Sequence, residues 1–180
     1  MRLSEIADAL AALEGREADE IHIRLRNPLF KSLLAGTEGR TRNSPADYSQ
    51  EELARARLLL ALFECGLSTG DLAKVNDKLN APPLAGPDHP DSASLAGGGT
   101  HYPSGLRSII RGARAGENWL IRVRFARTND GARSVNPSIV WEGWATEGRD
   151  GWAVDMLNGE THLGTLLIPA SDLIRPLLES

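Results

Sequence analysis

The residues of this sequence whose types could do chemistry together are basic ones, gathered between Ile21 and Arg57. That segment holds seven lysines and arginines against four acidic residues, although the 180-residue chain as a whole has a net charge of −4. The seven are Arg24, Arg26, Lys31, Arg40, Arg42, Arg55 and Arg57. Guanidinium and ammonium groups attract phosphate, and a local basic face is enough for DNA binding even in an acidic protein. The segment therefore indicates contact with nucleic acid rather than a reaction.

Side chains that could support catalysis or hold a cofactor are scattered. The four histidines, at 22, 89, 101 and 162, lack metal-ligand spacing, and Cys65 has no second thiolate in the chain. We expect Cys65 to be a small buried residue at the end of a helix. The glycine run 97–99 lacks the lysine of a phosphate-binding loop, and no serine or aspartate has the surroundings of an activated nucleophile. The sequence therefore predicts no enzyme activity, no cofactor and no metal site.

The elements that would position the basic segment begin with an amphipathic helix. Its apolar residues recur at helical spacing, at Leu3, Ile6, Leu10 and Leu13. Ser4 could cap its start, and Gly15 could end it.

Residues 17–26 permit two interpretations. Ile21, Ile23 and Leu25 alternate with His22, Arg24 and Arg26, a period of two that favours a strand. The alternative is a short helix that ends before Pro28 and turns its polar side outward.

The next part of the chain predicts a loop or hairpin followed by two helices. Glycine, asparagine and proline in 35–47 favour a hairpin that carries Arg40 and Arg42 outward. Ser49 with Glu52 three residues later is typical of a capping box, and the helix that follows should end at Gly66. Ser68 with Asp71 begins another short helix with an apolar side.

Residues 81–103 are rich in proline and glycine, which predicts a linker without a helix or a strand ladder. We place a first domain at 1–80 and a second module at 104–180. The second module should be a helix over 104–113, strands over 119–128, 138–144, 151–157 and 162–168 with a turn at 129–131, and a terminal helix capped by Ser171. The predicted fold class is α+β, with a small antiparallel sheet covered by helices.

The first domain resembles the DNA-binding domain of the MerR family, a winged helix-turn-helix. The resemblance rests on Tyr48–Leu53, on the arginines of 54–59 and on Cys65–Leu72, and it covers about residues 2–79. In that family a basic, glycine-containing wing leads into a Tyr-Ser plus acidic cap, a helix with outward arginines, a Gly-Leu-Ser turn and a short final helix. All of these occur here in the same order.

The resemblance implies a set of DNA-contacting residues. They are His22, Arg24, Arg26, Lys31, Arg40, Arg42, Tyr48 and Arg55. Arg24 and Arg26 could reach guanine edges or phosphates in the major groove, with His22 as a polar neighbour, while the wing arginines and Arg55 would neutralise flanking phosphates. For each arginine a solvated position is the alternative, and for Tyr48 the alternative is packing under the wing.

The resemblance and the composition together predict a sequence-specific transcriptional regulator that binds double-stranded DNA, commonly as a homodimer. The second module would serve dimerisation, a protein partner or a small ligand, and its four tryptophans could form either a core or a ligand pocket. A phage- or mobile-element-derived architectural or adaptor protein is the alternative function. No apolar run is long enough to span a bilayer or to form a signal-peptide core, so we expect no membrane contact and a cytoplasmic location.

Overall fold

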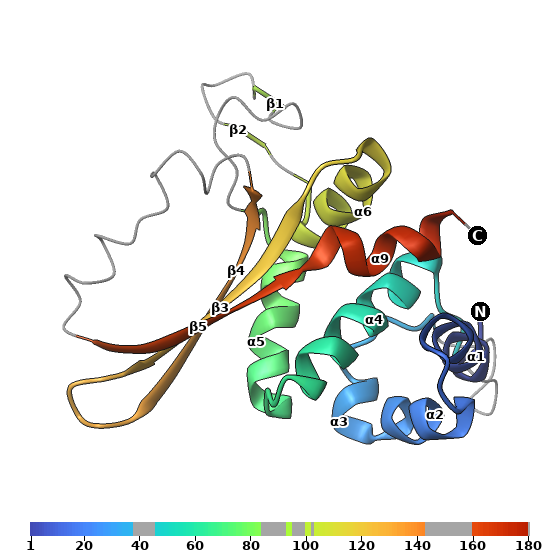
Figure 1. Cartoon of the computed structure of the whole chain (residues 1–180), viewed down its shortest axis with the longest axis horizontal. Helices are drawn as coiled ribbons and strands as arrows, with labels where there is room; N and C mark the ends of the chain where they lie inside the picture. Colours follow the sequence, from blue (N-terminus) through green and yellow to red (C-terminus); the bar gives the residue numbers. More distant parts are fainter. Residues whose placement is uncertain (38–45, 84–92, 95–99, 102, 143–159, 180) are drawn as a thin grey trace. The chain divides into compact units, whose positions relative to one another are not determined.

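A computed structural model describes residues 1–37, 46–83, 93–94, 100–101, 103–142 and 160–179. It combines helices with a three-stranded antiparallel sheet, which confirms the α+β class (Figure 1). Contacts divide the chain into two compact units, Met1–Ala73 with Leu173–Ser180, and Lys74–Asp172. Among the described residues, no helix has both the length and the apolar character needed to cross a bilayer.

The first unit is helical. It contains α1 (Leu3–Glu14), α2 (Ala18–Arg26), α3 (Pro28–Lys31), α4 (Gln50–Glu64) and the start of α5 (Thr69–Asn80). The side chains that form its core are less than 1% exposed, among them Ile6, Leu10, Ile21, Leu25, Leu58, Leu59 and Leu62. Burying each such side chain contributes roughly 1.5–3 kcal/mol, so this apolar centre fixes which face of each helix turns inward.

Several predicted helix ends differ from the observed ones. The cap at Ser4 is wrong, because α1 already begins at Leu3 with Arg2 at its N-cap position, whereas its predicted end at Gly15 is confirmed. Ser49 is the N-cap of α4 but makes no side-chain capping bond. The Ser68–Asp71 pair does form reciprocal bonds, since the Ser68 hydroxyl donates to Asp71 at 2.8 Å and accepts from the Asp71 amide at 3.2 Å.

Residues 18–26 form a helix, so the strand favoured by the local pattern is wrong. The alternation of apolar and polar residues is compatible with both periods, because Ile21 and Leu25 lie four residues apart and share one helical face. Both are fully buried, while Ile23 is 73% exposed. Burial of that one face decides in favour of the helix.

The second unit is built on a sheet with strand order β4-β3-β5. Its strands are β3 (Trp119–Arg127), β4 (Arg133–Trp141) and β5 (Thr161–Pro169), and all neighbours are antiparallel. Ile121 lies opposite both Ile139 and Ile168, and all three are buried. Gly131, with φ of 85°, allows the tight turn that joins β3 to β4.

One helix precedes the three-stranded sheet in the chain, and another follows it. α6 (Gly105–Ala115) precedes β3 and is capped by the Ser104 hydroxyl, which accepts from the Arg107 amide, and α9 (Ala170–Leu178) follows β5. Gly112 of α6 lies so close to Trp119 that a Cβ there would come within 2.3 Å of the indole nitrogen. The Ser171 hydroxyl accepts from the Trp119 backbone amide at 2.9 Å, which ties the start of α9 to the sheet.

Three predictions for the second unit are wrong in detail. Ser171 does not cap the terminal helix, because α9 already begins at Ala170. β4 begins at Arg133, earlier than the predicted Ser138, because an edge strand tolerates Pro137, which cannot donate a ladder hydrogen bond. Within the predicted linker, β1 (Ala93–Ser94) pairs with β2 (Thr100–His101), because a ladder this short has no proline or glycine in it. The predicted strand 151–157 lies outside the described residues.

Candidate nucleic-acid interface

The predicted interface is built on a pair of helices joined by a tight turn. α1 ends at Glu14 and α2 begins at Ala18, so only Gly15, Arg16 and Glu17 lie between them. Gly15 adopts a left-handed conformation with φ of 63°, which reverses the chain without the strain that a Cβ would add. Two helices joined in this way form one packed unit, because the inward faces of both are buried.

The end of α2 is set by an asparagine and a proline. The Asn27 side chain accepts a hydrogen bond from the Leu29 amide at 3.0 Å, and Pro28 occupies the first turn of α3. Proline is tolerated at that position because the amide it lacks would have no partner inside the helix. α3 then buries Phe30, which is 3% exposed. The break after Arg26 therefore leaves α2 as a separate short helix.

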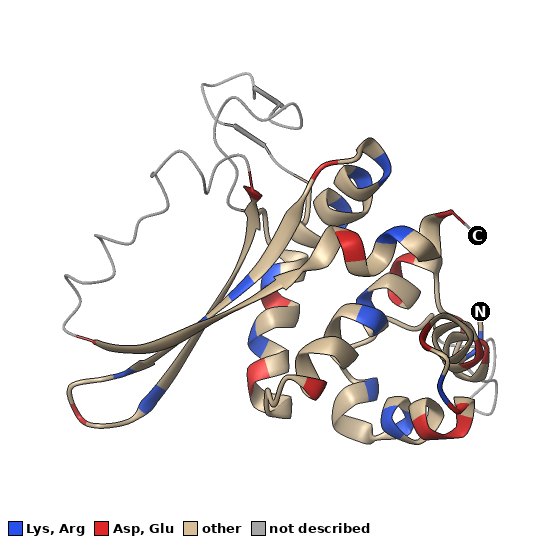
Figure 2. Ribbon diagram, in the orientation of Figure 1, with Lys and Arg blue, Asp and Glu red and all other residues tan. Residues whose placement is uncertain are grey.

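α2 presents a polar face with one large apolar side chain on it. Asp19, Ile23 and Arg26 are exposed and lie at helical spacing, with the half-buried His22 beside them. Acidic residues occupy the first turn and basic ones the last, which suits the helix dipole (Figure 2). In the part of the chain that the structure describes, neither Arg26 nor the exposed Lys31 of α3 has an ion-pair partner. Both side chains are exposed, and no described residue neutralises their charges.

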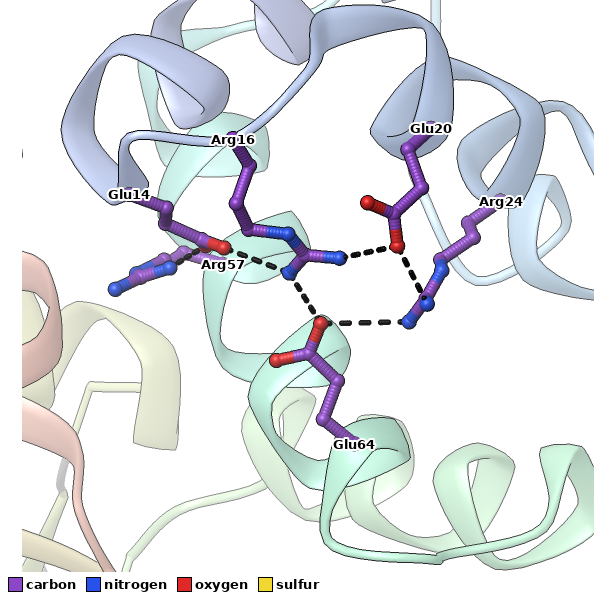
Figure 3. A network of polar contacts seen from close by, with 6 residues as sticks. All are labelled: Glu14, Arg16, Glu20, Arg24, Arg57 and Glu64. Atoms are coloured by element: carbon purple, nitrogen blue, oxygen red, sulfur yellow. Dashed lines mark hydrogen bonds and ion pairs between the residues drawn. The ribbon is translucent and has the colours of Figure 1, made fainter.

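Arg24 lies in a different environment, a network of three arginines and three glutamates (Figure 3). Its guanidinium donates to Glu20 at 2.8 Å and to Glu64 of α4 at 3.3 Å. Arg16, from the turn before α2, pairs with Glu20 at 2.8 Å and also with Glu64. The network thus joins the turn, α2 and the end of α4.

The network continues into a more buried region. Glu14, whose side chain is 9% exposed, accepts from Arg16 at 2.8 Å and pairs with Arg57 of α4. Burial lowers the pKa of Arg57, whereas the hydrogen bond with Glu64 raises the pKa of Arg16. A separate hydrogen bond, which Arg16 donates to Glu20, lowers the pKa of Glu20. With equal numbers of each charge, the network is neutral, so Arg24 adds little net charge to the outer face.

A second contact brings together the two ends of the predicted wing. Thr37 and Asp47 form an isolated antiparallel bridge, with amide-to-carbonyl distances of 2.8 and 3.2 Å. Tyr48, which is 5% exposed, lies against Gly36 so closely that a Cβ there would approach its ring to 2.9 Å. Burial raises the pKa of the Tyr48 hydroxyl. Tyr48 is therefore a packing residue at the base of this segment, while Arg40 and Arg42 lie outside the described residues.

Arg55, which was predicted to contact a phosphate, does not lie on an open surface. It is 7% exposed, and its Nε donates to Glu52 at 3.1 Å. The other carboxylate oxygen of Glu52 accepts from the Ala35 amide at 2.9 Å, next to the base of the predicted wing. Glu52 was expected to form a capping box with Ser49, but its carboxylate instead binds Arg55 and the Ala35 amide. The i, i+3 spacing of the two residues was the sequence signal that could have revealed it.

Four of the predicted residues therefore lie on or beside the open side of α2 and α3: His22, Arg24, Arg26 and Lys31. Sequence reasoning missed Ile23, because in a strand it would have shared the buried face with Ile21 and Leu25. It also missed the glutamates that neutralise Arg24. The i, i+4 spacing of Glu20 and Arg24 was readable in the sequence and favours a helix.

Two of the four tryptophans of the second unit, Trp119 and Trp141, lie in the part of the chain that the structure describes. Trp119 is 1% exposed and borders a pocket of about 110 Å³, whereas small-molecule sites typically measure about 300–1,000 Å³. A groove of about 360 Å³ has no tryptophan in its lining, which comprises Lys74, Asp77, Lys78, Ser134, Val135, Asn136 and Pro137. Trp141 is half-buried, and Trp144 and Trp152 lie outside the described residues.

Metal ligands do not gather within the described ranges, where no group of three or more His, Cys, Asp or Glu residues could hold an ion. No protein-family model, curated protein or solved structure matches the chain.

Proposed function

We propose that residues 1–80 form a winged helix-turn-helix domain similar to that of the MerR family, and that the protein is a sequence-specific DNA-binding transcriptional regulator. The observation that carries this proposal is the outward side of α2 and α3. It follows a three-residue turn and presents Arg26, His22 and Lys31. A helix held in this way fits the major groove, which is about 12 Å wide.

In this proposal the two kinds of arginine have separate roles. Arg26 and Lys31 contact DNA, because their charges are not used within the described part of the chain. Arg24 and Arg16 hold α2 against α4 through Glu20 and Glu64, so they position the recognition helix (Figure 3). Arg40 and Arg42 would reach phosphates from a wing whose base is the Thr37–Asp47 bridge.

A homodimer is part of the same proposal. One small winged helix-turn-helix reads only a few base pairs, and two copies bound to half-sites about 34–36 Å apart give a useful specificity. We therefore expect a footprint with two-fold symmetry. The sheet of the second unit is the proposed location of the dimer contact.

The test is a salt-dependent gel shift against a genomic fragment library, followed by footprinting of the retained fragments. Each phosphate contact adds about 0.9 to the slope of log affinity against log salt concentration. The double variant Arg26→Ala/Lys31→Ala should therefore bind more weakly, with a slope reduced by about one to two. Arg114→Ala, which removes an exposed arginine from the last turn of α6, is the matched control and should leave both values unchanged.

Two results would contradict the proposal. Absence of binding at low salt, with a folded protein, would exclude any DNA-binding role. Equal weak binding to every fragment, without a footprint, would favour the architectural or adaptor function instead of a regulator.

A further inference from the structure

We infer that Ile23 is a specificity-determining residue, which contacts the C5-methyl group of a thymine in the major groove of the target site. The inference rests on the proposed function and names part of the sequence that the protein would read. It starts from an apolar side chain that the fold leaves in solvent.

The exposure of Ile23 is a consequence of helix register. The same helix hides Ile21 and Leu25 completely, whereas Ile23, between them in sequence, is 73% exposed. Its side chain adds nothing to the core, and exposing it forgoes a transfer free energy of roughly 1.5–3 kcal/mol. A contact made only in a complex would recover part of that free energy.

The neighbours of Ile23 point to DNA as the ligand. On the same outward face lie Asp19, four residues before, and Arg26, three residues after, with His22 at its side. Each of these can hydrogen-bond a base edge: arginine binds guanine O6 and N7, and aspartate accepts from the amino group of cytosine. The only apolar feature in the major groove is the thymine methyl group, and an isoleucine among hydrogen-bonding side chains complements it.

The length of the face matches a short run of base pairs. A helix rises about 1.5 Å per residue, so Asp19 and Arg26 lie about 10 Å apart along the axis. Base pairs stack about 3.4 Å apart, so the face spans about three steps. Ile23 lies between the two polar residues, so we expect its thymine within one or two base pairs of the guanine read by Arg26.

Leu29 provides a matched comparison. It is also an exposed apolar residue, at 59%, but it belongs to α3, beyond the break at Asn27 and Pro28. If Ile23 served a protein partner instead of a base, Leu29 could belong to the same apolar contact. The experiment therefore distinguishes a contact of Ile23 with a thymine from a contact of both apolar residues with a protein partner.

The experiment replaces thymine by deoxyuridine, one position at a time, in a fragment that the wild-type protein footprints. This removes a single methyl group and leaves base pairing intact. For the wild type we expect affinity to fall about three- to fivefold at one thymine of each half-site, the effect of one buried methyl group. Ile23→Ala should bind the thymine site more weakly than the wild type, and it should lose the penalty for uracil there. Leu29→Ala should keep the loss of affinity that uracil causes at that position.

Circular dichroism and thermal unfolding of both variants check that the fold is intact. A uracil penalty that is unchanged in Ile23→Ala would assign the methyl contact to another residue and overturn the inference. So would a wild type that footprints DNA but tolerates uracil everywhere, and in that case the proposed function would stand. A folded wild type that binds no DNA would overturn both.

Discussion

α2 and α6 are two short helices that carry both apolar and basic residues, and they differ in which of these residues they leave exposed. α6 turns Leu106, Ile109 and Ile110 inward and its arginines outward. α2 buries two apolar residues but leaves Ile23 in solvent, and it carries exposed side chains of both charges. Arginines on the outside of a helix are common and indicate little by themselves. The combination of the exposed Ile23 with Arg26, which has no ion-pair partner among the described residues, is the reason that α2 is the proposed contact surface.

The largest expected effect is a difference in unfolding free energy between substitutions on the buried and the exposed side of α2. Leu25→Ala removes a fully buried side chain and should lower the free energy of unfolding by about 2–5 kcal/mol. Ile23→Ala, on the exposed side of the same helix, should change it by less than about 0.5 kcal/mol. Urea unfolding of both variants measures the difference. Similar losses for the two variants would mean that Ile23 also packs in the folded protein, and α2 would no longer differ from α6.

The next effect tests how α6 is packed. A Cβ at Gly112 would lie 2.4 Å from Trp119 Cδ1, so Gly112→Ala should destabilise the protein by about 1–3 kcal/mol. Gly70→Ala in α5 is the control, because its Cβ would meet only the Ser68 hydroxyl oxygen, at 3.9 Å, and alanine favours helix. Thermal unfolding should show a lower melting temperature for the first variant and an equal or higher one for the second. A stabilising Gly112→Ala substitution would contradict the close contact of α6 with the sheet.

An equal or smaller effect concerns the charges that hold α2 in place, whereas the start of α6 is capped by a serine hydroxyl. Glu14→Gln leaves the guanidinium of Arg57 without its carboxylate partner and should cost about 1–3 kcal/mol. Arg24→Gln, which breaks only exposed pairs, should cost no more than about 1 kcal/mol. Denaturant unfolding at low ionic strength compares them. The reverse order would mean that the exposed half of the network carries the stability.

The smallest expected effect is a pH dependence of the free energy of unfolding, which comes from Glu20. Because the pKa of Glu20 is lower in the folded protein, its contribution is fully present above the ordinary glutamate value of about 4.3. It is lost as the pH falls through the lower folded value. Glu20→Gln should therefore differ from the wild type in unfolding free energy at neutral pH and approach it at strongly acidic pH. A constant difference across that range would show that Glu20 does not act through its charge.

The sequence predicted most elements because their apolar residues follow one period. The helices at 50–64, 69–80 and 105–115 and the strands at 119–127 and 161–169 are examples. Residues 18–26 were ambiguous, because three apolar residues at alternate positions suit a strand, and two of them, four apart, suit a helix. Only packing against α1 decides which of the three is left out. That decision depends on tertiary packing, and it also determines which side chain faces solvent.

The candidate interface was predicted in outline but not residue by residue. The sequence does not show whether the charge of an arginine is neutralised by a neighbour. The partner can lie far away in the sequence, as Glu64 does for Arg24. Arg55 looked like an outward cation, but Glu52 holds it inside. Charge counting along a sequence therefore overestimates how many cations a ligand can meet.

The position of Cys65 gives the chain a practical property. It is the only cysteine in the sequence and was expected to be buried, yet it is exposed at the C-terminal end of α4, next to Glu64 of the arginine–glutamate network. A maleimide fluorophore can therefore be attached at one defined point without engineering a new thiol. The emission of this label would report on the surroundings of α2 during a titration with DNA, so binding could be followed without an introduced cysteine.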